Sequence, residues 1–94
     1  MYIVYIIQNN HSQDFYIGVT SNLKNRIRSH NSSGRKFTTK KSGEWILIYA
    51  EVFRSKADAY LRERRLKNHG SSKVELFKRI KNSKLDNKSE EGRS

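Results

Sequence analysis

The chain has 94 residues, enough for one domain with a modest core, and its lack of cysteine excludes disulfide bonds and thiolate metal sites. Twenty Lys and Arg side chains stand against nine Asp and Glu, giving a net charge of +11. No apolar run approaches the ~20 residues that cross a bilayer, and no basic-then-apolar signal segment opens the chain, so we expect a cytoplasmic protein.

The positive charge is concentrated before residue 83. Residues 83–94 contain equal numbers of basic and acidic side chains, which leaves 17 basic and six acidic side chains on residues 1–82. A folded domain with this surplus repels itself unless it meets a polyanion, and nucleic acid is the commonest such partner because neutralised phosphates release counterions. Solubility alone, or an acidic membrane or protein surface, would also account for the charge. We expect a DNA partner, with RNA as the alternative, and no membrane association.

Two strands open the chain. Residues 2–7 are β-branched or aromatic on both faces and predict a strand, and residues 15–20 predict a second strand that forms a hairpin with the first across a polar turn. In the second strand Phe15, Ile17 and Val19 share one face, and Gly18 lies on the opposite one. Because glycine weakens a strand, its presence there indicates close approach by a ligand or a neighbouring backbone.

Helices and a third strand follow. Capping residues at 20–22 precede a helix over about 22–31, a long basic loop covers 31–43, and residues 44–53 predict a strand that we expect at the centre of the sheet. A capping box at 55–58 opens a helix that continues to about residue 68 and ends before Gly70, and a last helix is expected from Ser72. The order β-β-α-β-α-α predicts an α+β fold, a small sheet flanked by helices, over residues 1–82, followed by a polar, disordered tail over 83–94.

Glu63 is a charged residue on a stripe of the second helix that also carries Ala59 and Leu66. The competing stripe of Ala57, Tyr60 and Leu61 is also apolar, and the sequence leaves open which one faces the sheet. Taken alone, Glu63 indicates a surface salt bridge with a basic neighbour on its own helix, namely Arg62, Arg64 or Lys67.

Four further residues carry chemistry that packing does not require. Arg26 and His30 are four residues apart and therefore neighbours on the face of the first helix that bears its apolar residues, where a simple phosphate-contacting flank is the alternative. Tyr5 and Tyr16 lie on the two aromatic strands, and each taken singly would be a core residue.

In combination these residues resemble the GIY-YIG nuclease family. The pattern is Ile3-Val4-Tyr5, ten intervening residues, Tyr16-Ile17-Gly18, Arg26, and a late helical Glu63. The segments 16–31, 36–38 and 55–63 are similar to the compact single-domain bacterial members, and the resemblance covers about residues 2–82. The first motif departs from Gly-Ile-Tyr but keeps its tyrosine.

The resemblance implies a three-stranded antiparallel sheet and a divalent-metal phosphodiesterase site. Glu63 would bind one Mg²⁺ or Mn²⁺, and Arg26 would steady the scissile phosphate. Tyr5 and Tyr16 would line the site, one of them helping to activate water, with His30 as the other candidate base because its ordinary pKa is near 6.5. Gly18 would leave room for the phosphate.

The larger members of the family owe their specificity to an attached DNA-binding domain, so we expect this domain's own positive surface to bind the nucleic acid. The residues expected on that surface are Arg28, Arg35, Lys36, Lys40 and Lys41. Phosphate contacts position a duplex without reading its sequence, so we expect structure-selective or weakly sequence-specific endonuclease activity, or dependence on a partner protein. A non-catalytic DNA- or RNA-binding module on the same fold is the alternative, and the sequence leaves open whether the domain serves DNA repair, recombination or a mobile element.

Overall fold

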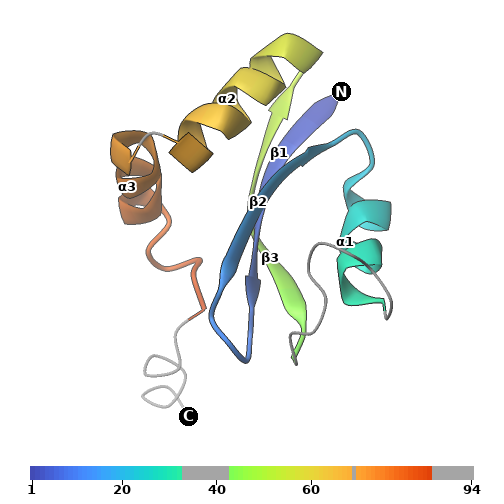
Figure 1. Ribbon diagram of the computed structural model, residues 1–94, viewed down its shortest axis with the longest axis vertical. Helices are drawn as coiled ribbons and strands as arrows, with labels where there is room; N and C mark the ends of the chain where they lie inside the picture. Colours follow the sequence, from blue (N-terminus) through green and yellow to red (C-terminus); the bar gives the residue numbers. More distant parts are fainter. Residues whose placement is uncertain (33–42, 69, 86–94) are drawn as a thin grey trace.

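The structure is a computed structural model that describes residues 1–32, 43–68 and 70–85 (Figure 1). The elements in chain order are β1 (Tyr2–Asn9), β2 (Phe15–Thr20), α1 (Leu23–Asn31), β3 (Trp45–Phe53), α2 (Lys56–Asn68) and α3 (Gly70–Arg79). This order confirms the predicted α+β class and its β-β-α-β-α-α sequence of elements.

The three strands form one antiparallel sheet in the order β2-β1-β3. The expectation that residues 44–53 form the central strand is therefore wrong, because β1 lies in the middle and β3 forms an edge. The physical reason is burial: β1 is buried without interruption from Val4 to Asn9, whereas β3 alternates and leaves Leu47 and Val52 exposed. Helices pack over both faces of β1, and this coverage rather than apolar content distinguishes β1 from β3.

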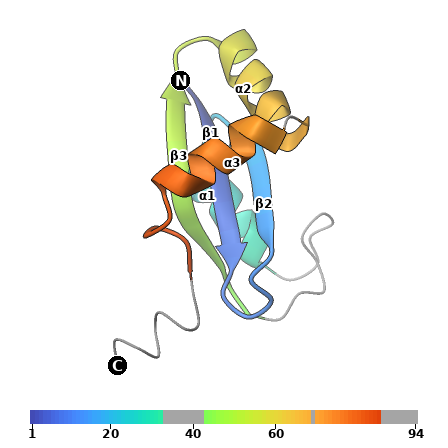
Figure 2. The same cartoon turned by 90° about the vertical axis from the view of Figure 1, so that its left-hand side faces the viewer.

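Helices cover both faces of the sheet. Figure 1 shows α1 on one side and α2 with α3 on the other, and Figure 2 shows α3 passing in front of the sheet with α1 behind it. On the α2–α3 side, alternate residues of β1 and β2 such as Val4 and Ile17 pack with Ala59, Leu66 and Leu76. This packing resolves the two possible stripes of α2: the stripe with Glu63 faces the sheet, and Tyr60 and Leu61 are exposed.

The helix ends follow local capping. The Asn22 side chain accepts a hydrogen bond from the Asn25 amide at 3.1 Å and caps α1, and Ser55 Oγ accepts one from the Asp58 amide at 3.2 Å and caps α2. The last helix starts two residues before the expected Ser72, since Gly70 is its first residue.

The described chain continues through Leu85, three residues past the expected end of the domain. The Gln8 side chain accepts a hydrogen bond from the Leu85 amide at 2.7 Å and donates one to its carbonyl at 3.4 Å. Segment 83–85 is thereby attached to β1, while the rest of the expected tail lies outside the described residues. In the part of the chain that the structure describes, no helix has the length and apolar character of a membrane span.

Candidate active site

A buried tyrosine–histidine pair lies between the sheet and α1. Tyr5 stands on the central strand and His30 near the end of α1, a hydrogen bond of 2.9 Å joins the Tyr5 hydroxyl to His30 Nε2, and both side chains are fully buried. The neighbouring Asn31 holds the helix end in place, because its amide accepts a hydrogen bond from the Trp45 backbone N–H at 2.8 Å and donates one to the Trp45 carbonyl at 3.1 Å. The end of α1 is thus tied to the start of β3.

Gly18 makes room for the Tyr5 side chain. The two residues face each other across the β1–β2 ladder, and a Cβ placed on Gly18 would lie 2.6 Å from the Tyr5 hydroxyl oxygen and 2.7 Å from Cζ. The expected space for a phosphate above Gly18 is therefore occupied by the phenol ring. The sequence indicated a close approach at this position, and the approaching group is a side chain of the same site.

Tyr16 completes an aromatic group around this pair. Its ring centroid lies 4.7 Å from that of His30 and 6.3 Å from that of Tyr5, and Trp45 closes the far side at 6.5 Å from His30. Unlike Tyr5 and His30, Tyr16 is only partly buried. We call Tyr5, Tyr16 and His30 the tyrosine–histidine cluster, and Tyr16 is the member that reaches the surface.

Burial, and to a smaller extent the neighbouring Tyr16, raise the pKa of Tyr5 to about 12. Arg26 opposes this shift through hydrogen bonding to the phenol and through its charge, and Glu63 adds to it. Both of these charged side chains therefore act on the Tyr5 hydroxyl, although they come from helices on opposite faces of the sheet. Arg26 itself is partly exposed on α1.

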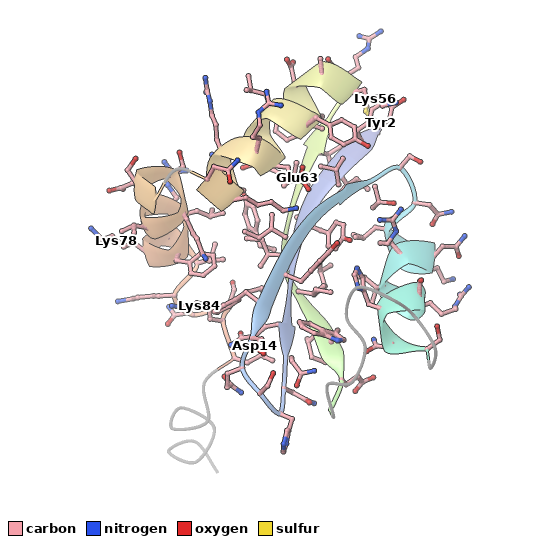
Figure 3. All side chains as sticks on the ribbon, in the orientation of Figure 1. Tyr2, Asp14, Lys56, Glu63, Lys78 and Lys84 are labelled. Atoms are coloured by element: carbon pink, nitrogen blue, oxygen red, sulfur yellow. The ribbon has the colours of Figure 1, made fainter. Side chains whose placement is uncertain are left out.

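Glu63 lies on the side of α2 that faces the sheet (Figure 3), and its side chain is 18% exposed. Its Oε2 is 3.0 Å from Lys67 Nζ, and the same ammonium lies 5.9 Å from the centre of the Tyr16 ring. Lys67 therefore connects the carboxylate to the tyrosine–histidine cluster beside β2, an edge strand. The salt bridge expected for Glu63 taken alone is present, with Lys67 as its partner.

The donor set around Glu63 fits a magnesium-type ion and excludes a closed protein cage. Across residues 1–32, 43–68 and 70–85, no three or more His, Cys, Asp or Glu side chains gather in a way that could hold a metal ion. A single carboxylate suits Mg²⁺, which usually keeps several waters and takes further oxygens from a substrate phosphate. The position beside Oε2 already accommodates a cation, the Lys67 ammonium, whose side chain is 45% exposed.

The expected nucleic-acid contacts are described only in part. Arg28 is exposed on α1, where its Nη1 donates a hydrogen bond to the Asn25 side chain at 3.1 Å. The other four residues expected to bind nucleic acid lie outside the described residues, namely Arg35, Lys36, Lys40 and Lys41.

Sequence reasoning missed two contributors. The spacing of Lys67, four residues after Glu63, predicts their salt bridge but gives no signal for its second contact, with the Tyr16 ring. Asn31 has no signal in the sequence, because its partner Trp45 lies 14 residues further along the chain.

Comparison with known proteins agrees with this arrangement. A family model described as the GIY-YIG catalytic domain matches residues 1–86. A UPF0213 protein of Limosilactobacillus reuteri is 37% identical over 79 residues, which span 82% of this chain and 78% of the relative. A UPF0213 protein of Staphylococcus haemolyticus is 36% identical over 64 residues, which span 68% of this chain and 77% of the relative. No solved structure matches the chain.

Proposed function

This chain belongs to the GIY-YIG catalytic domain family, a nuclease family, and we propose that it is a metal-dependent endonuclease that hydrolyses DNA phosphodiester bonds. The observation that carries the proposal is that two oppositely charged side chains adjoin the tyrosine–histidine cluster: Arg26 hydrogen-bonds to the Tyr5 phenol, and Glu63 reaches Tyr16 through Lys67. Phosphoryl transfer needs positioning and stabilisation of charge more than covalent chemistry, and this group of side chains supplies both.

Arg26 is the proposed phosphate ligand. A guanidinium offers several N–H donors in a fixed plane and can bind two phosphate oxygens at once, which orients the phosphate as well as attracting it. Negative charge grows on those oxygens during hydrolysis, so the same hydrogen bonds become stronger as the reaction proceeds.

Glu63 is the proposed ligand of Mg²⁺ or Mn²⁺. When bound, such an ion would withdraw charge from the phosphate and acidify water. In the resting protein Lys67 neutralises the carboxylate, and because this lysine is long and exposed it can leave when a cation and a phosphate arrive. Lys67 would then be free to contact the DNA backbone beside Tyr16.

Tyr16 is the proposed contact with the attacking water. With a pKa of about 12, Tyr5 is ionised in only on the order of one molecule in 10⁵ at neutral pH, and it is fully buried, so it is a poor resting base. Tyr16 reaches the surface and its ring packs at a tilt against that of His30, which in turn shares a hydrogen bond with Tyr5. The buried pair thus fixes the ring against which Tyr16 packs.

The experiment is a supercoiled-plasmid nicking assay with Mg²⁺, with Mn²⁺ and with EDTA, repeated on branched and single-stranded DNA and on RNA. Glu63→Gln keeps the size of the side chain and removes its charge, and Glu75→Gln on the exposed side of α3 is the matched control. We expect metal-dependent nicking in the wild type and in Glu75→Gln, and none in Glu63→Gln.

The alternative is a non-catalytic nucleic-acid-binding module, and the Glu63–Lys67 ion pair is the observation that favours it, because a purely structural salt bridge would look the same. Salt-sensitive binding of DNA or RNA without cleavage of any substrate, unchanged in Glu63→Gln, would replace the nuclease proposal with this one.

A further inference from the structure

A groove on the outer surface of α3 lies away from the tyrosine–histidine cluster and has a volume of about 770 Å³. Its floor contains Phe77 and Val74, the latter 53% exposed, and its rim is formed by lysines from α3 and from the segment after it. We call this surface the α3 groove; its lysines are Lys73, Lys78, Lys81 and Lys84. Figure 3 shows two of them, Lys78 and Lys84, on the α3 side of the molecule.

The charge of the α3 groove is one-sided. Four lysines line it, and among the described residues that line it there is no carboxylate. Two of the ammonium groups lie over the Phe77 ring, Lys84 Nζ at 5.4 Å and Lys73 Nζ at 5.7 Å from its centre. A surface that combines several cations with an aromatic ring complements a polyanion that also presents flat apolar groups.

The α3 groove is separated from the candidate active site by one wall of aromatic side chains. Lys73 lines both this groove and a second hollow of about 250 Å³, which is bounded by Tyr16 and Lys67 on the other side. The Phe15 and Phe77 rings, with centroids 4.8 Å apart, form the wall between the two. A chain of cations and aromatic rings therefore runs from the Glu63–Lys67 pair, past Tyr16, to the far end of α3.

We propose that the α3 groove binds an unpaired single-stranded nucleic-acid segment that leads into the active site. The statement that the bound segment leads into an active site rests on the proposed nuclease function. The binding itself does not require catalysis. The apolar floor argues for a single strand: duplex DNA presents phosphates and would use the lysines alone, whereas unpaired bases can lie on Phe77 and Val74.

Single-strand binding at this surface gives the endonuclease its preference for structure over sequence. Base stacking on an aromatic ring is tolerant of sequence because every base has a flat face. A junction between paired and unpaired DNA would place its flap in the α3 groove and its scissile phosphate near Tyr16. We therefore expect faster cleavage of flapped or branched substrates than of an intact duplex.

Binding is tested by fluorescence anisotropy with a labelled single strand and with the duplex of the same sequence, using full-length protein that carries Glu63→Gln to prevent cleavage. The test variant adds Lys78→Glu and Lys81→Glu, both exposed on the groove rim. The matched control adds Arg54→Glu and Lys56→Glu, which are also exposed and change the net charge equally but lie before and at the start of α2. A third protein carries Val74→Ser, which alters the floor without altering charge.

We expect the rim variant to weaken single-strand binding roughly tenfold and to flatten the salt dependence of log affinity by about 1.4, while the control loses less than about threefold. Val74→Ser is expected to weaken single-strand binding severalfold and leave duplex binding unchanged. Equal losses in the rim and control variants would overturn the proposal, because net charge alone would then explain binding. Equal losses of single strand and duplex would also overturn it, and so would tighter binding to anionic vesicles or to a polyglutamate peptide. Absence of nicking by the protein with Glu63 intact would reject the nuclease function and leave the binding result standing.

Discussion

The closest contact in the candidate site leads to a specific prediction for Gly18→Ala. The added methyl carbon would lie 2.6 Å from the Tyr5 hydroxyl oxygen and 2.7 Å from Cζ, distances that real Cβ atoms do not adopt. Tyr5 cannot swing out of the way, since its ring is fully buried between the sheet and α1. The substitution must therefore displace the phenol and break its hydrogen bond to His30.

The expected loss of folding free energy in Gly18→Ala can be added up from three contributions. Overpacking a core costs about 1–3 kcal/mol and a lost buried hydrogen bond about 1 kcal/mol, while replacing a strand glycine with alanine returns about 0.5–1 kcal/mol. The net loss is about 2 kcal/mol, which for a domain of this size lowers the melting temperature by about 8–16 °C. Nicking activity, measured well below that temperature, is expected to fall as well because the tyrosine–histidine cluster loses its geometry.

Thermal unfolding followed by circular dichroism measures the effect, with Gly70→Ala as the matched control. A Cβ on Gly70 meets no atom within 4 Å, so this substitution in α3 should leave stability unchanged or raise it by up to about 1 kcal/mol. In a Tyr5→Phe background Gly18→Ala should cost less, because the hydroxyl contact and the hydrogen bond are already gone. A Gly18→Ala protein that has the wild-type melting temperature and nicks DNA at the wild-type rate would refute the packing argument.

Three further predictions concern the phosphate ligand, an ion pair and the end of the domain. Arg26→Lys keeps the positive charge but loses the planar set of N–H donors. The nicking rate should therefore fall roughly 100-fold, while DNA affinity in a gel-shift assay changes less than about threefold. Equal losses of nicking rate and DNA affinity would contradict a role of Arg26 in catalysis. Burial would raise the pKa of Glu51, but hydrogen bonds from Arg62 and Tyr49 hold this pKa below its ordinary value. The ionised carboxylate therefore stabilises the fold above pH 4.5, and this stabilisation is lost as the pH falls through the lowered pKa. Urea unfolding should therefore show a larger loss of stability on acidification to pH 3 in the wild type than in Glu51→Gln, and identical pH dependence would count against this ion pair. Deleting residues 86–94 should leave the melting temperature unchanged. Deleting residues 83–94 should lower it, because the hydrogen bonds between Leu85 and β1 are lost. Equal melting temperatures of the two truncated proteins would show that these hydrogen bonds do not contribute to stability.

The fold was predictable in segments whose apolar residues follow a single strand or helix periodicity. Alternation over 15–20 gave β2 its correct bounds, and capping residues with an apolar stripe gave α1 to within one residue. The place of β3 was not predictable from apolar content, because residues 45–49 are as apolar as those of β1. What distinguishes the strands is coverage: β1 has helices over both faces, and this depends on where α1 and α2 pack rather than on the composition of the strand.

The sequence predicted which residues belong to the site, but not how their side chains contact one another. Each candidate residue has an ordinary explanation when taken singly, and their order and spacing gave the combination its meaning. The contact between Gly18 and Tyr5 required the register of the hairpin, which sets these two residues directly opposite each other. The bridging position of Lys67 required the knowledge that α2 packs with its Glu63 stripe toward the sheet, which the sequence left open.

Exposure separates the roles of the two tyrosines and yields the last prediction. Tyr5 and His30 are fully buried, so a scissile phosphate arriving at the surface meets Tyr16, Lys67 and Glu63 first. If Tyr16 contacts the attacking water, Tyr16→Phe should lower the nicking rate by roughly 100-fold or more with little change in stability. Tyr5→Phe removes a buried hydrogen bond, so it should lower the melting temperature by several degrees and the nicking rate by less than Tyr16→Phe. Parallel melting curves and plasmid-nicking rates at several pH values test this order; a larger rate loss in Tyr5→Phe would move the water contact to the buried pair and require the site to open before it reacts.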